Sequence, residues 1–331
     1  MASKIDTAIL KALSLDPAST TLACHGGSGF SSTYKLSSRA SDGEEKLYFV
    51  KTGANGSETM FAGELTSLNT IHSIVPSLCP QSFAHGQLFS SPGAFLATDF
   101  LNLSPSSSSK SGSGIPLAHK LAKLHSTPAP IPDGYDKAMF GFPVPTCCGE
   151  TVQDNSYKGS WAEFYAENRL RHILRCAEKN QGRDTTLSQL VETTASIIVP
   201  RLLRDGHLTS PDGSPIAPVV VHGDLWSGNR GKGTIGCEGG IEEVVFDPSA
   251  CYAHSEYEFG IMGMFGGFGG SFNKEYWTLK GKDDPVSEWE DRRVLYELYH
   301  HLNHYAMFGG GYKSGAESIM RKLIKKFGDG K

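Results

Sequence analysis

The chain has 331 residues, of which 39% are hydrophobic and 20% charged, as expected of a soluble globular protein with a substantial core. Its 31 basic and 35 acidic residues give a formal net charge of −4, which argues against a nucleic-acid-binding protein, since such proteins are normally clearly basic. No apolar run approaches the ~20 residues needed to span a bilayer, so no membrane-crossing segment is expected.

The first hundred residues are predicted to be mostly strands with one internal helix. A short amphipathic helix within residues 1–16 precedes two strands on either side of a glycine-rich turn in 20–36, and "EKLYFVKT" (45–52) reads as another strand. Apolar residues at helical spacing predict a helix over 57–72. A further strand is expected over 93–101, ending near an aspartate.

The rest of the chain is predicted to be mostly helical. The segment 103–116 is rich in serine, glycine and proline and is interpreted as a flexible surface loop. Helix-period apolar stripes follow in 116–125, 160–174 and 292–305. We therefore predict an α+β fold with a small β-rich lobe, residues 1–102, and a larger, mostly helical lobe, residues 103–331.

Two short strands interrupt the helical part, and each ends in polar residues. They cover residues 219–222 and 243–247, and both are rich in β-branched or aromatic side chains. Because they lie close in the sequence and each leads to an aspartate, we expect them to pair as a hairpin that brings Asp224 and Asp247 to one site.

The segment "HGDLWSGN" gives the first indication of chemistry. His222, Asp224 and Asn229 have the spacing H-x-D-x-x-x-x-N, which protein kinases use in their catalytic loop. There the aspartate accepts the proton of the acceptor hydroxyl and the asparagine binds Mg²⁺. The alternative is a polar turn after a strand, because Asp, Asn and Gly favour turns for backbone reasons alone.

Asp247 fits the role of a second metal ligand. Mg²⁺ usually takes one or two carboxylates together with phosphate oxygens. We therefore expect Asn229 and Asp247 to hold Mg²⁺. Asp247 precedes Pro248, so a simple Asp-Pro turn is the alternative interpretation.

The N-terminal part contains residues suited to a nucleotide. The glycine-rich turn between the first two strands can fold its backbone N–H groups over phosphates, although an ordinary hairpin turn is an alternative. Lys51, at the end of a strand, is expected to reach the α/β-phosphates, and Glu64 on the next helix to hold it by an ion pair. Glu58 is a weaker candidate for that pairing because it lies nearer the helix start, and a solvated Lys51 and Glu64 are the alternatives.

These features occur in the order glycine-rich loop, lysine, glutamate, strand, H-x-D-x-x-x-x-N and aspartate. Independent coincidences would seldom produce that order. The residues together therefore predict an ATP-dependent, kinase-like phosphotransferase that uses Mg²⁺.

The chain also resembles the fructosamine/ketosamine-3-kinase family over nearly its whole length. The resemblance rests on "HGDLWSGN" with Trp226, on "FDPSACYAHSEYEFGIMGMFGGF" (246–268) and on "FGFPVPTCCG" (140–149). Further matching segments are "FVKTG" (49–53), "MFAGELTSL" (60–68), "KLAKLH" (120–125), "WAEFYAENRL" (161–170) and "LNHYAMFGGGY" (302–312). Aminoglycoside phosphotransferases share H-G-D-x-x-x-x-N but usually lack the tryptophan and the "CCG" segment.

The resemblance implies a protein-kinase-like fold and phosphorylation of the 3-hydroxyl of a ketosamine, either free or on a protein lysine. The product is unstable and releases the amine, so the implied activity is deglycation. A cytoplasmic enzyme acting on glycated proteins or free ketosamines, as a monomer or weak dimer, is the expectation.

Individual roles are also implied by the resemblance. Asp224 would orient and deprotonate the sugar hydroxyl, and Trp226 would contact the apolar part of the glycated lysine. His254 and Glu256 would lie near the sugar, with a structural role as the alternative for His254. The residues expected to contact the nucleotide are Gly27, Ser28, Gly29, Phe30 and Ser31 over the phosphates, Lys51, and the backbone of Asp99, Phe100 and Leu101 around the adenine.

Two other functions are compatible with the residues. The same fold could phosphorylate an aminoglycoside, choline or another small alcohol. The chain could also be a catalytically inactive sensor of glycated proteins, although the complete set Lys51, Asp224, Asn229 and Asp247 argues against that.

Overall fold

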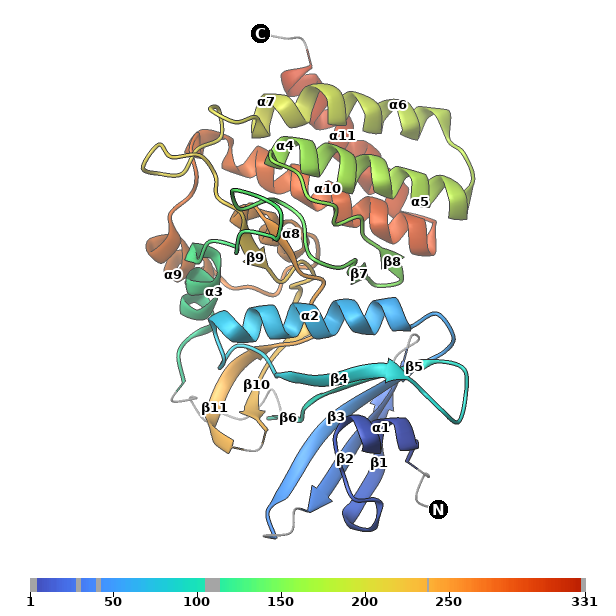
Figure 1. Ribbon diagram of the computed structural model, residues 1–331. Coiled ribbons are helices and arrows are strands. Elements are labelled where there is room, and N and C mark those ends of the chain that lie inside the picture. The colour runs from blue at the N-terminus through green and yellow to red at the C-terminus, as the bar shows by residue number, and fades with distance from the viewer. Residues whose placement is uncertain (1–4, 28–30, 40–42, 105–113, 237, 329–331) are drawn as a thin grey trace. The chain divides into compact units, whose positions relative to one another are not determined.

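The computed structural model describes residues 5–27, 31–39, 43–104, 114–236 and 238–328 (Figure 1). The chain divides into two compact units. The first comprises Met1–Lys120 and Gly228–Pro248, and the second comprises Leu121–Ser227 and Ser249–Lys331. The predicted division of function, with a nucleotide-binding lobe at 1–102 and a catalytic lobe at 103–331, stays a prediction.

The first unit is built on a five-stranded antiparallel sheet with strand order β1-β2-β3-β5-β4. Its strands are β1 Thr20–Gly27, β2 Ser32–Arg39, β3 Glu45–Gly53, β4 Ser82–Gln87 and β5 Ala94–Asp99. β3 is central and pairs with β2 on one side and β5 on the other. The predicted strands 45–52 and 93–101 and the strand–turn–strand in 20–36 are confirmed, whereas β4 was not predicted.

Two helices pack against this sheet. In Figure 1 the long helix α2 (Glu58–Ile74) lies along β4 and β5. Its Phe61 packs with Ala94 and Leu96, whereas the short helix α1 (Thr7–Ala12) contributes Ile9 to a separate apolar cluster. Successive side chains of a strand point to opposite faces, so residues of β3 and β5 alternate between these two environments.

A three-stranded sheet of order β11-β10-β6 completes the first unit. It consists of β6 Leu101–Leu103, β10 Arg230–Ile235 and β11 Glu238–Val245. The predicted hairpin between 219–222 and 243–247 is wrong. β11 pairs with β10, a strand that the sequence patterns did not reveal because glycines interrupt it, and the strand at 219–221 pairs elsewhere.

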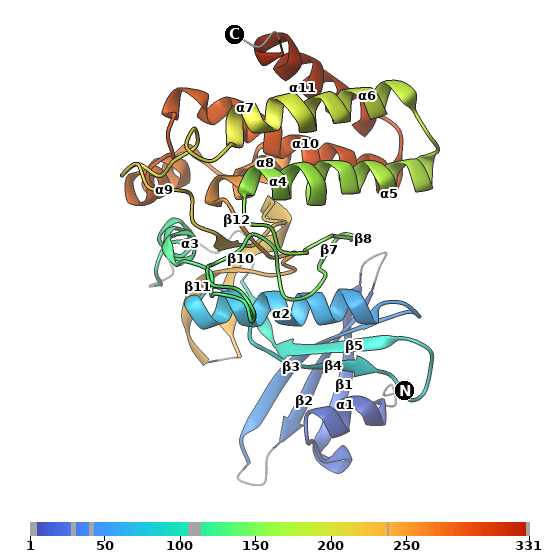
Figure 2. The same ribbon diagram turned by 45° about the horizontal axis from the view of Figure 1, so that its top comes forward.

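The second unit is mainly helical. Figure 2 shows α5, α6, α10 and α11 packed side by side. The helices beyond α2 are α3 Leu117–Ser126, α4 Trp161–Phe164, α5 His172–Gln181, α6 Thr185–Thr193, α7 Val199–Leu203, α8 Phe259–Phe265, α9 Gly270–Lys280, α10 Trp289–Phe308 and α11 Tyr312–Phe327. A π-helical segment, Tyr165–Arg171, joins α4 to α5. The helices predicted within 116–125, 160–174 and 292–305 are confirmed.

Helix α10 is buried through most of its length, because it contacts α5, α8 and α11. Two short antiparallel pairs lie in the same unit: β9 (Val219–Val221) with β12 (Cys251–Ala253), and β7 (Cys147–Cys148) with β8 (Thr151–Val152). Val220 and Val221 are fully buried, which explains the β-branched run that ends at His222.

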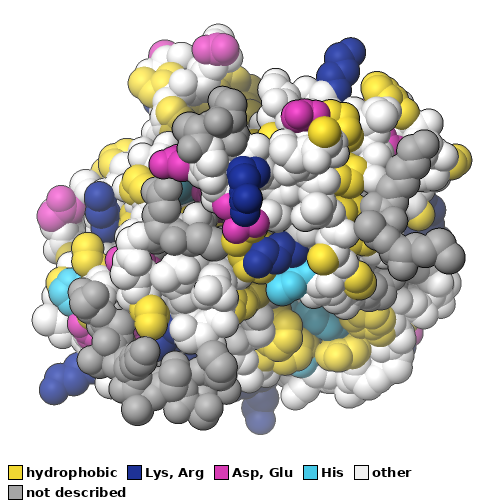
Figure 3. All heavy atoms as spheres, turned by 90° about the horizontal axis from the view of Figure 1, so that it is seen from below, with side chains coloured by type: hydrophobic (Ala, Val, Ile, Leu, Met, Phe, Trp, Pro, Cys, Tyr) yellow, Lys and Arg dark blue, Asp and Glu magenta, His cyan; other side chains and the backbone are white. Residues whose placement is uncertain are grey.

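The surface agrees with the balanced charge of the sequence. On the face drawn in Figure 3, basic side chains of the described residues stand in ones and twos, with acidic ones nearby, and do not form a broad basic patch. Among the helices that the structure describes, none is both long enough and apolar enough to cross a lipid bilayer. Most of the predicted loop 103–116, residues 105–113, lies outside the described residues.

Candidate active site

Lys51 is held on the α2 side of the five-stranded sheet. It stands opposite Leu96 in the pairing of β3 with β5, and Leu96 belongs to the apolar cluster that includes Phe61 of α2. Strand alternation therefore directs Lys51 toward α2, where Glu64 lies one turn after Phe61. Only 9% of Lys51 is exposed.

The ammonium of Lys51 binds two carboxylates. Nζ donates to Oε1 of Glu64 at 2.6 Å and to Oδ1 of Asp247, also at 2.6 Å. Burial alone would lower the pKa of Lys51, but the two carboxylates outweigh it and raise the pKa above its usual value, so the lysine stays charged. Glu58, the weaker candidate, instead accepts a hydrogen bond from Gln87.

Asp247 has an unusual backbone conformation. Its φ is +57°, in the left-handed region that costs an L residue of this kind of order 1 kcal/mol or more. About half of its side chain is exposed, at 52%. A strained, accessible carboxylate next to a buried lysine is typical of a functional position.

Asn229 lies next to Asp247 because of the β10–β11 hairpin. Arg230 pairs with Val245, and the N–H of Phe246 donates to the carbonyl of Asn229 at 3.1 Å. The register thus places Asn229 opposite Phe246, one residue before Asp247. Asn229 is largely buried, at 7% exposure. Amide and carboxylate oxygens are the ligands that Mg²⁺ accepts, so this pair is chemically suited to such an ion.

The predicted nucleotide contacts lie partly outside the described residues. Ser28, Gly29 and Phe30 are not described, whereas Gly27 ends β1 and Ser31 directly precedes β2. A Cβ on Gly27 would stand 2.9 Å from the carbonyl oxygen of Ser31, so this close approach of Gly27 to Ser31 favours a residue without a side chain at position 27.

The predicted adenine contacts form the junction between β5 and β6. Asp99 closes β5, its carboxylate accepts from the N–H of Gln81, and Leu101 opens β6. Phe100 between them is buried, and its carbonyl accepts from Gly236. Their contact with adenine stays a prediction.

Asp224 follows β9 in the second unit through a tight bend at Gly223. Gly223 has φ +80°, and a Cβ there would stand 2.1 Å from the carbonyl oxygen of Ser249. Only glycine therefore fits this bend. The N–H of Asp224 donates to Nδ1 of His222 at 3.3 Å, while the carbonyl of Asp224 accepts from the N–H of Trp226.

A buried glutamate fixes the backbone of this loop. The carboxylate of Glu258 accepts from the N–H of His222 at 2.6 Å and from the N–H of Gly223 at 3.0 Å. Burial raises the pKa of Glu258, but the imidazole of His125 3.4 Å away, the nearby His222 ring and the backbone bond from His222 outweigh it, so the pKa is lowered overall. An ionised Glu258 thus anchors the residues just before Asp224, and His222 supports the loop from within the core.

Trp226 lies beyond this loop and is 38% exposed, with its ring 5.7 Å from that of Phe265. The two rings form an accessible aromatic surface, which is the property that the predicted contact with an apolar lysine chain requires. The contact itself stays a prediction.

His254 and Glu256 are buried, at 1% exposure each, and have protein partners. The ring nitrogens of His254 hydrogen-bond with Tyr296 and Asp283, and the Glu256 carboxylate binds Arg292. This arrangement favours the structural alternative for His254. Contact of His254 or Glu256 with a sugar stays a prediction. The burial of both side chains does not favour it.

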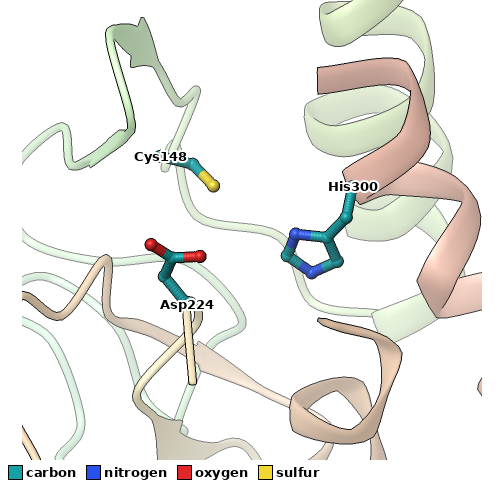
Figure 4. Close-up of side chains that lie close together, drawn as sticks. All are labelled: Cys148, Asp224 and His300. Carbon is teal, nitrogen blue, oxygen red and sulfur yellow. The ribbon is translucent and has the colours of Figure 1, made fainter. Parts of the chain in front are cut away.

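The structure also shows a cluster of three side chains, including Asp224, that was not predicted from the sequence. The thiol of Cys148, the carboxylate of Asp224 and the ring of His300 point toward one another (Figure 4). Cys148 follows Cys147 in β7 and His300 lies in α10, so about 75 residues separate each from Asp224 along the chain. No spacing pattern could have revealed a cluster assembled over such separations.

A pocket elsewhere in the second unit has no predicted site residue in its lining. Its walls are formed by Phe142–Pro145, Glu150–Tyr157, His172, Cys176, Lys179, Asn180 and Met307. We assign no chemistry to it.

The chain is similar to known proteins over most of its length. The fructosamine kinase family profile matches residues 5–326. The chain is 34% identical over 278 residues to the protein-ribulosamine 3-kinase, chloroplastic, of Arabidopsis thaliana, covering 84% of this chain and 76% of the relative. It is 32% identical over 303 residues to the ketosamine-3-kinase of Mus musculus, covering 86% and 90%.

Solved structures support the fold. A Thermobifida fusca protein assigned as a fructosamine-3-kinase superimposes with a TM-score of 0.72 and 22% identity, covering 97% of this chain and 98% of that one. The predicted α+β, protein-kinase-like fold, with a β-rich part and a larger helical part, is confirmed.

Proposed function

We propose that this chain, which belongs to the fructosamine kinase family, is an ATP-dependent kinase that phosphorylates the 3-hydroxyl of ketosamines on glycated lysines. The observation that carries the proposal is the pair of ion pairs that the buried Lys51 makes with Glu64 and with the half-exposed Asp247. A lysine fixed in this way is the phosphate anchor of kinase-type phosphoryl transfer. The relatives named as ribulosamine and ketosamine kinases supply the acceptor class.

The residues of the first unit are suited to ATP with a divalent cation. Lys51 carries the positive charge that phosphate oxygens need, and Glu64 keeps it in place when a phosphate competes for it. Asn229 pairs with Phe246, the residue before Asp247, and both Asn229 and Asp247 offer oxygen ligands, which favours Mg²⁺ over softer ions. When bound, the ion neutralises the charge that develops on the transferred phosphoryl group.

Asp224 is assigned as the residue that orients the acceptor. Its carboxylate accepts a hydrogen bond from the sugar hydroxyl and takes the proton as the oxygen attacks phosphorus. Its backbone is fixed on both sides, by His222 and by Trp226, so the carboxylate is positioned before the substrate arrives. Trp226 and Phe265 supply the apolar surface for the alkyl chain of the modified lysine.

The proposal is tested by incubating the protein with ATP, Mg²⁺ and a ketosamine formed on a lysine derivative. We expect ADP and a ketosamine 3-phosphate in equal amounts, followed by release of the free amine. Identification of the phosphorylated carbon by nuclear magnetic resonance spectroscopy distinguishes this result from phosphorylation elsewhere. Ribulosamine and fructosamine differ by one hydroxylated carbon, so relative kcat/KM values decide between them.

Two alternatives give different results in the same experiment. A small-molecule phosphotransferase would prefer aminoglycosides or choline over ketosamines. An inactive sensor of glycated proteins would form no ADP and would gain no thermal stability from ATP. The complete set Lys51, Asp224, Asn229 and Asp247 argues against the sensor.

Location and assembly stay predictions. A cytoplasmic protein, monomeric or weakly dimeric, is what we expect, whereas the Arabidopsis relative is chloroplastic by name. Fractionation of the source cells and light scattering of the purified protein test these two points.

A further inference from the structure

The cluster of Cys148, Asp224 and His300 has the composition of a transition-metal site. One potential ligand atom from each, the thiol sulfur, a carboxylate oxygen and a ring nitrogen, all lie within 4.8 Å of one another. Figure 4 shows that the three side chains converge from separate segments of the second unit. The three residues are therefore held by different parts of one folded unit.

His300 provides an independent reason to expect a ligand. Its side chain is fully buried in α10, and neither ring nitrogen has a hydrogen-bond partner among the described residues. Buried ring nitrogens are normally paired, so an unpaired one requires an explanation. Burial, with smaller effects from His304, His301 and Arg169, lowers the pKa of His300 well below its usual value, so the ring is neutral and can bind a metal.

A second cluster of possible metal ligands differs from the His300 cluster in its hydrogen bonding. His254, Glu256 and Asp283 also lie close together and are buried. In that group, however, both His254 nitrogens and both Glu256 oxygens have protein partners. Asp283 Oδ1 is the one ligand atom of that group without a hydrogen bond among the described residues, so the group behaves mainly as a structural network. Of these two clusters of described residues, the His300 cluster is the one with unpaired buried nitrogens.

The donor set selects the kind of ion. A thiolate, an imidazole and one carboxylate suit Zn²⁺ or a similar borderline-soft ion, whereas Mg²⁺ prefers oxygen ligands alone. Zinc bond lengths of about 2.0–2.3 Å imply ligand atoms about 3.3–3.8 Å apart in a tetrahedral site. The present separations, up to 4.8 Å, would have to shorten to that spacing when an ion binds. Three protein ligands leave a fourth position for water.

We propose that Cys148, Asp224 and His300 form a binding site for Zn²⁺ or a chemically similar cation, and that the bound ion inhibits the enzyme by occupying the Asp224 carboxylate. The inhibitory part rests on the proposed function of Asp224 as the acceptor base. On binding, the Cys148 thiol releases its proton to solvent, His300 binds as the neutral ring, and no residue is oxidised or reduced. The charges of the thiolate and carboxylate balance the ion.

The binding part is tested without reference to activity. The purified protein is titrated with Co²⁺ while the thiolate-to-cobalt charge-transfer absorption is recorded, and Zn²⁺ is then added to displace the cobalt. We expect one site per chain. Cys148→Ala and His300→Gln should each weaken binding by more than about 100-fold, because loss of a ligand costs more than loss of an outer-shell contact.

Matched controls separate the site from other thiols and histidines. Cys147→Ala removes the neighbouring thiol and His304→Gln removes the half-buried histidine one turn further along α10, and both should bind as the wild type does. Cys148→Ser preserves volume if Cys148→Ala folds poorly. Equal binding by the wild type and both Cys148 variants, or binding lost only in Cys147→Ala, would overturn the site.

The inhibitory part is tested by ADP formation with buffered Zn²⁺ and saturating Mg²⁺, so that ATP does not sequester the zinc. Each variant is compared with its own zinc-free rate. We expect inhibition of the wild type that a zinc chelator reverses, and at least a tenfold higher inhibitory concentration for Cys148→Ser and His300→Gln. An active wild type that binds zinc at this site without inhibition would overturn the inhibitory claim. If ketosamine kinase activity is absent, the proposed function fails, while the cobalt titration still decides the site.

Discussion

Lys51 shows how much a single residue depends on its partners. It is nearly buried, and its charge is maintained by Glu64 and by Asp247, a residue distant in the sequence. The Glu64 side chain is 12% exposed, and burial together with the nearby Asp247 raises its pKa against the effect of Lys51. Removing the lysine would therefore leave an uncompensated, largely buried carboxylate.

Substitution of Lys51 separates stability from catalysis. Lys51→Met should lower the free energy of unfolding by about 3 kcal/mol, because breaking a buried ion pair leaves one charge unpaired. It should also lower kcat/KM for ATP by about 10²–10³. In the double variant Lys51→Met/Glu64→Gln, stability should recover in part, whereas activity should not.

Denaturant unfolding and steady-state kinetics measure these two effects. If Lys51→Met kept normal kcat/KM for ATP, Lys51 would be only a structural cation. If the double variant regained activity together with stability, the same conclusion would follow.

Substitution of Asp224 should lower the rate of phosphoryl transfer without weakening the binding of ATP and Mg²⁺. Asp224→Asn keeps the shape but loses the base, so kcat should fall by about 10²–10⁴. Thermal stabilisation by ATP and Mg²⁺ should stay near that of the wild type. Asp212→Asn, a change of an acidic residue at an exposed turn of the same unit, should be indistinguishable from wild type in both measurements.

Gly223 allows the loop to bend just before Asp224, and Gly213 offers a matched control for its backbone conformation. Gly223 and Gly213 both have φ +80°, but a Cβ at Gly213 would meet nothing within 4 Å. Gly213→Ala therefore measures the backbone strain alone, expected to be about 1 kcal/mol. Gly223→Ala adds the clash with the Ser249 carbonyl.

We expect Gly223→Ala to be destabilised by about 3 kcal/mol or more and to lose kcat about 10²-fold where it folds, because Asp224 is displaced. Gly213→Ala should keep full activity. Equal stability and activity of the two variants, measured by urea unfolding and turnover, would contradict the claim that this bend positions Asp224.

The loop is also sensitive to pH through Glu258. The pKa of Glu258 is lowered from its ordinary value of 4.5 in the folded protein. The unfolded chain therefore binds the proton more readily, so this stabilisation is present above about pH 4.5 and is lost as the pH falls through the folded-state pKa. The titratable groups nearest to it are His125, whose Nε2 lies 3.4 Å from Oε2 of Glu258, and His222.

Glu258→Gln tests this account of the loop. The variant loses a charge-assisted pair of bonds to the backbone, which should cost about 1.5–3 kcal/mol at pH 7. Its unfolding free energy should also change less than that of the wild type between pH 5 and pH 3. A parallel pH dependence for both proteins would show that Glu258 does not contribute.

At the same scale, local patterns predicted some elements and failed for others. Helix α2 and strand β3 were predicted correctly because the apolar spacing of a helix and the β-branched and aromatic run of a strand depend only on residues close in the sequence. β10 was missed because it contains two glycines in "RGKGTI". The pairing of β9 with β12 rather than β11 was missed because sequence proximity favours a hairpin, whereas the fold places β9 and β11 in different units.

In the candidate site, too, local sequence patterns could be predicted, whereas contacts between distant segments could not. Asp224 and Asn229 were predicted from the spacing H-x-D-x-x-x-x-N, and Lys51, Glu64 and Asp247 from their places near a strand end or on a helix with regular apolar spacing. Their roles stay predictions. The burial of His254 and Glu256 was not predictable, since it depends on Arg292 and Tyr296 from α10. The Cys148–Asp224–His300 cluster requires three distant segments and likewise became visible only in the fold.

Across the whole molecule, residues of the first unit are suited to the nucleotide, and residues of the second are suited to the acceptor. The chain passes between the units on both sides of the segment Gly228–Pro248, which carries Asn229 and Asp247. The family profile spans both units, whose separate roles stay predictions.

The most direct test of the central claim is the competition of acceptors for one ATP-dependent reaction. Lysine-linked ribulosamine and fructosamine, an aminoglycoside and choline are compared by kcat/KM, with Asp224→Asn as the control and with the phosphorylated carbon identified. We predict the highest kcat/KM for a ketosamine, phosphate on its 3-oxygen, and a rate at least about 100-fold lower for Asp224→Asn. A higher kcat/KM for choline or the aminoglycoside, or full ketosamine turnover by Asp224→Asn, would contradict the account.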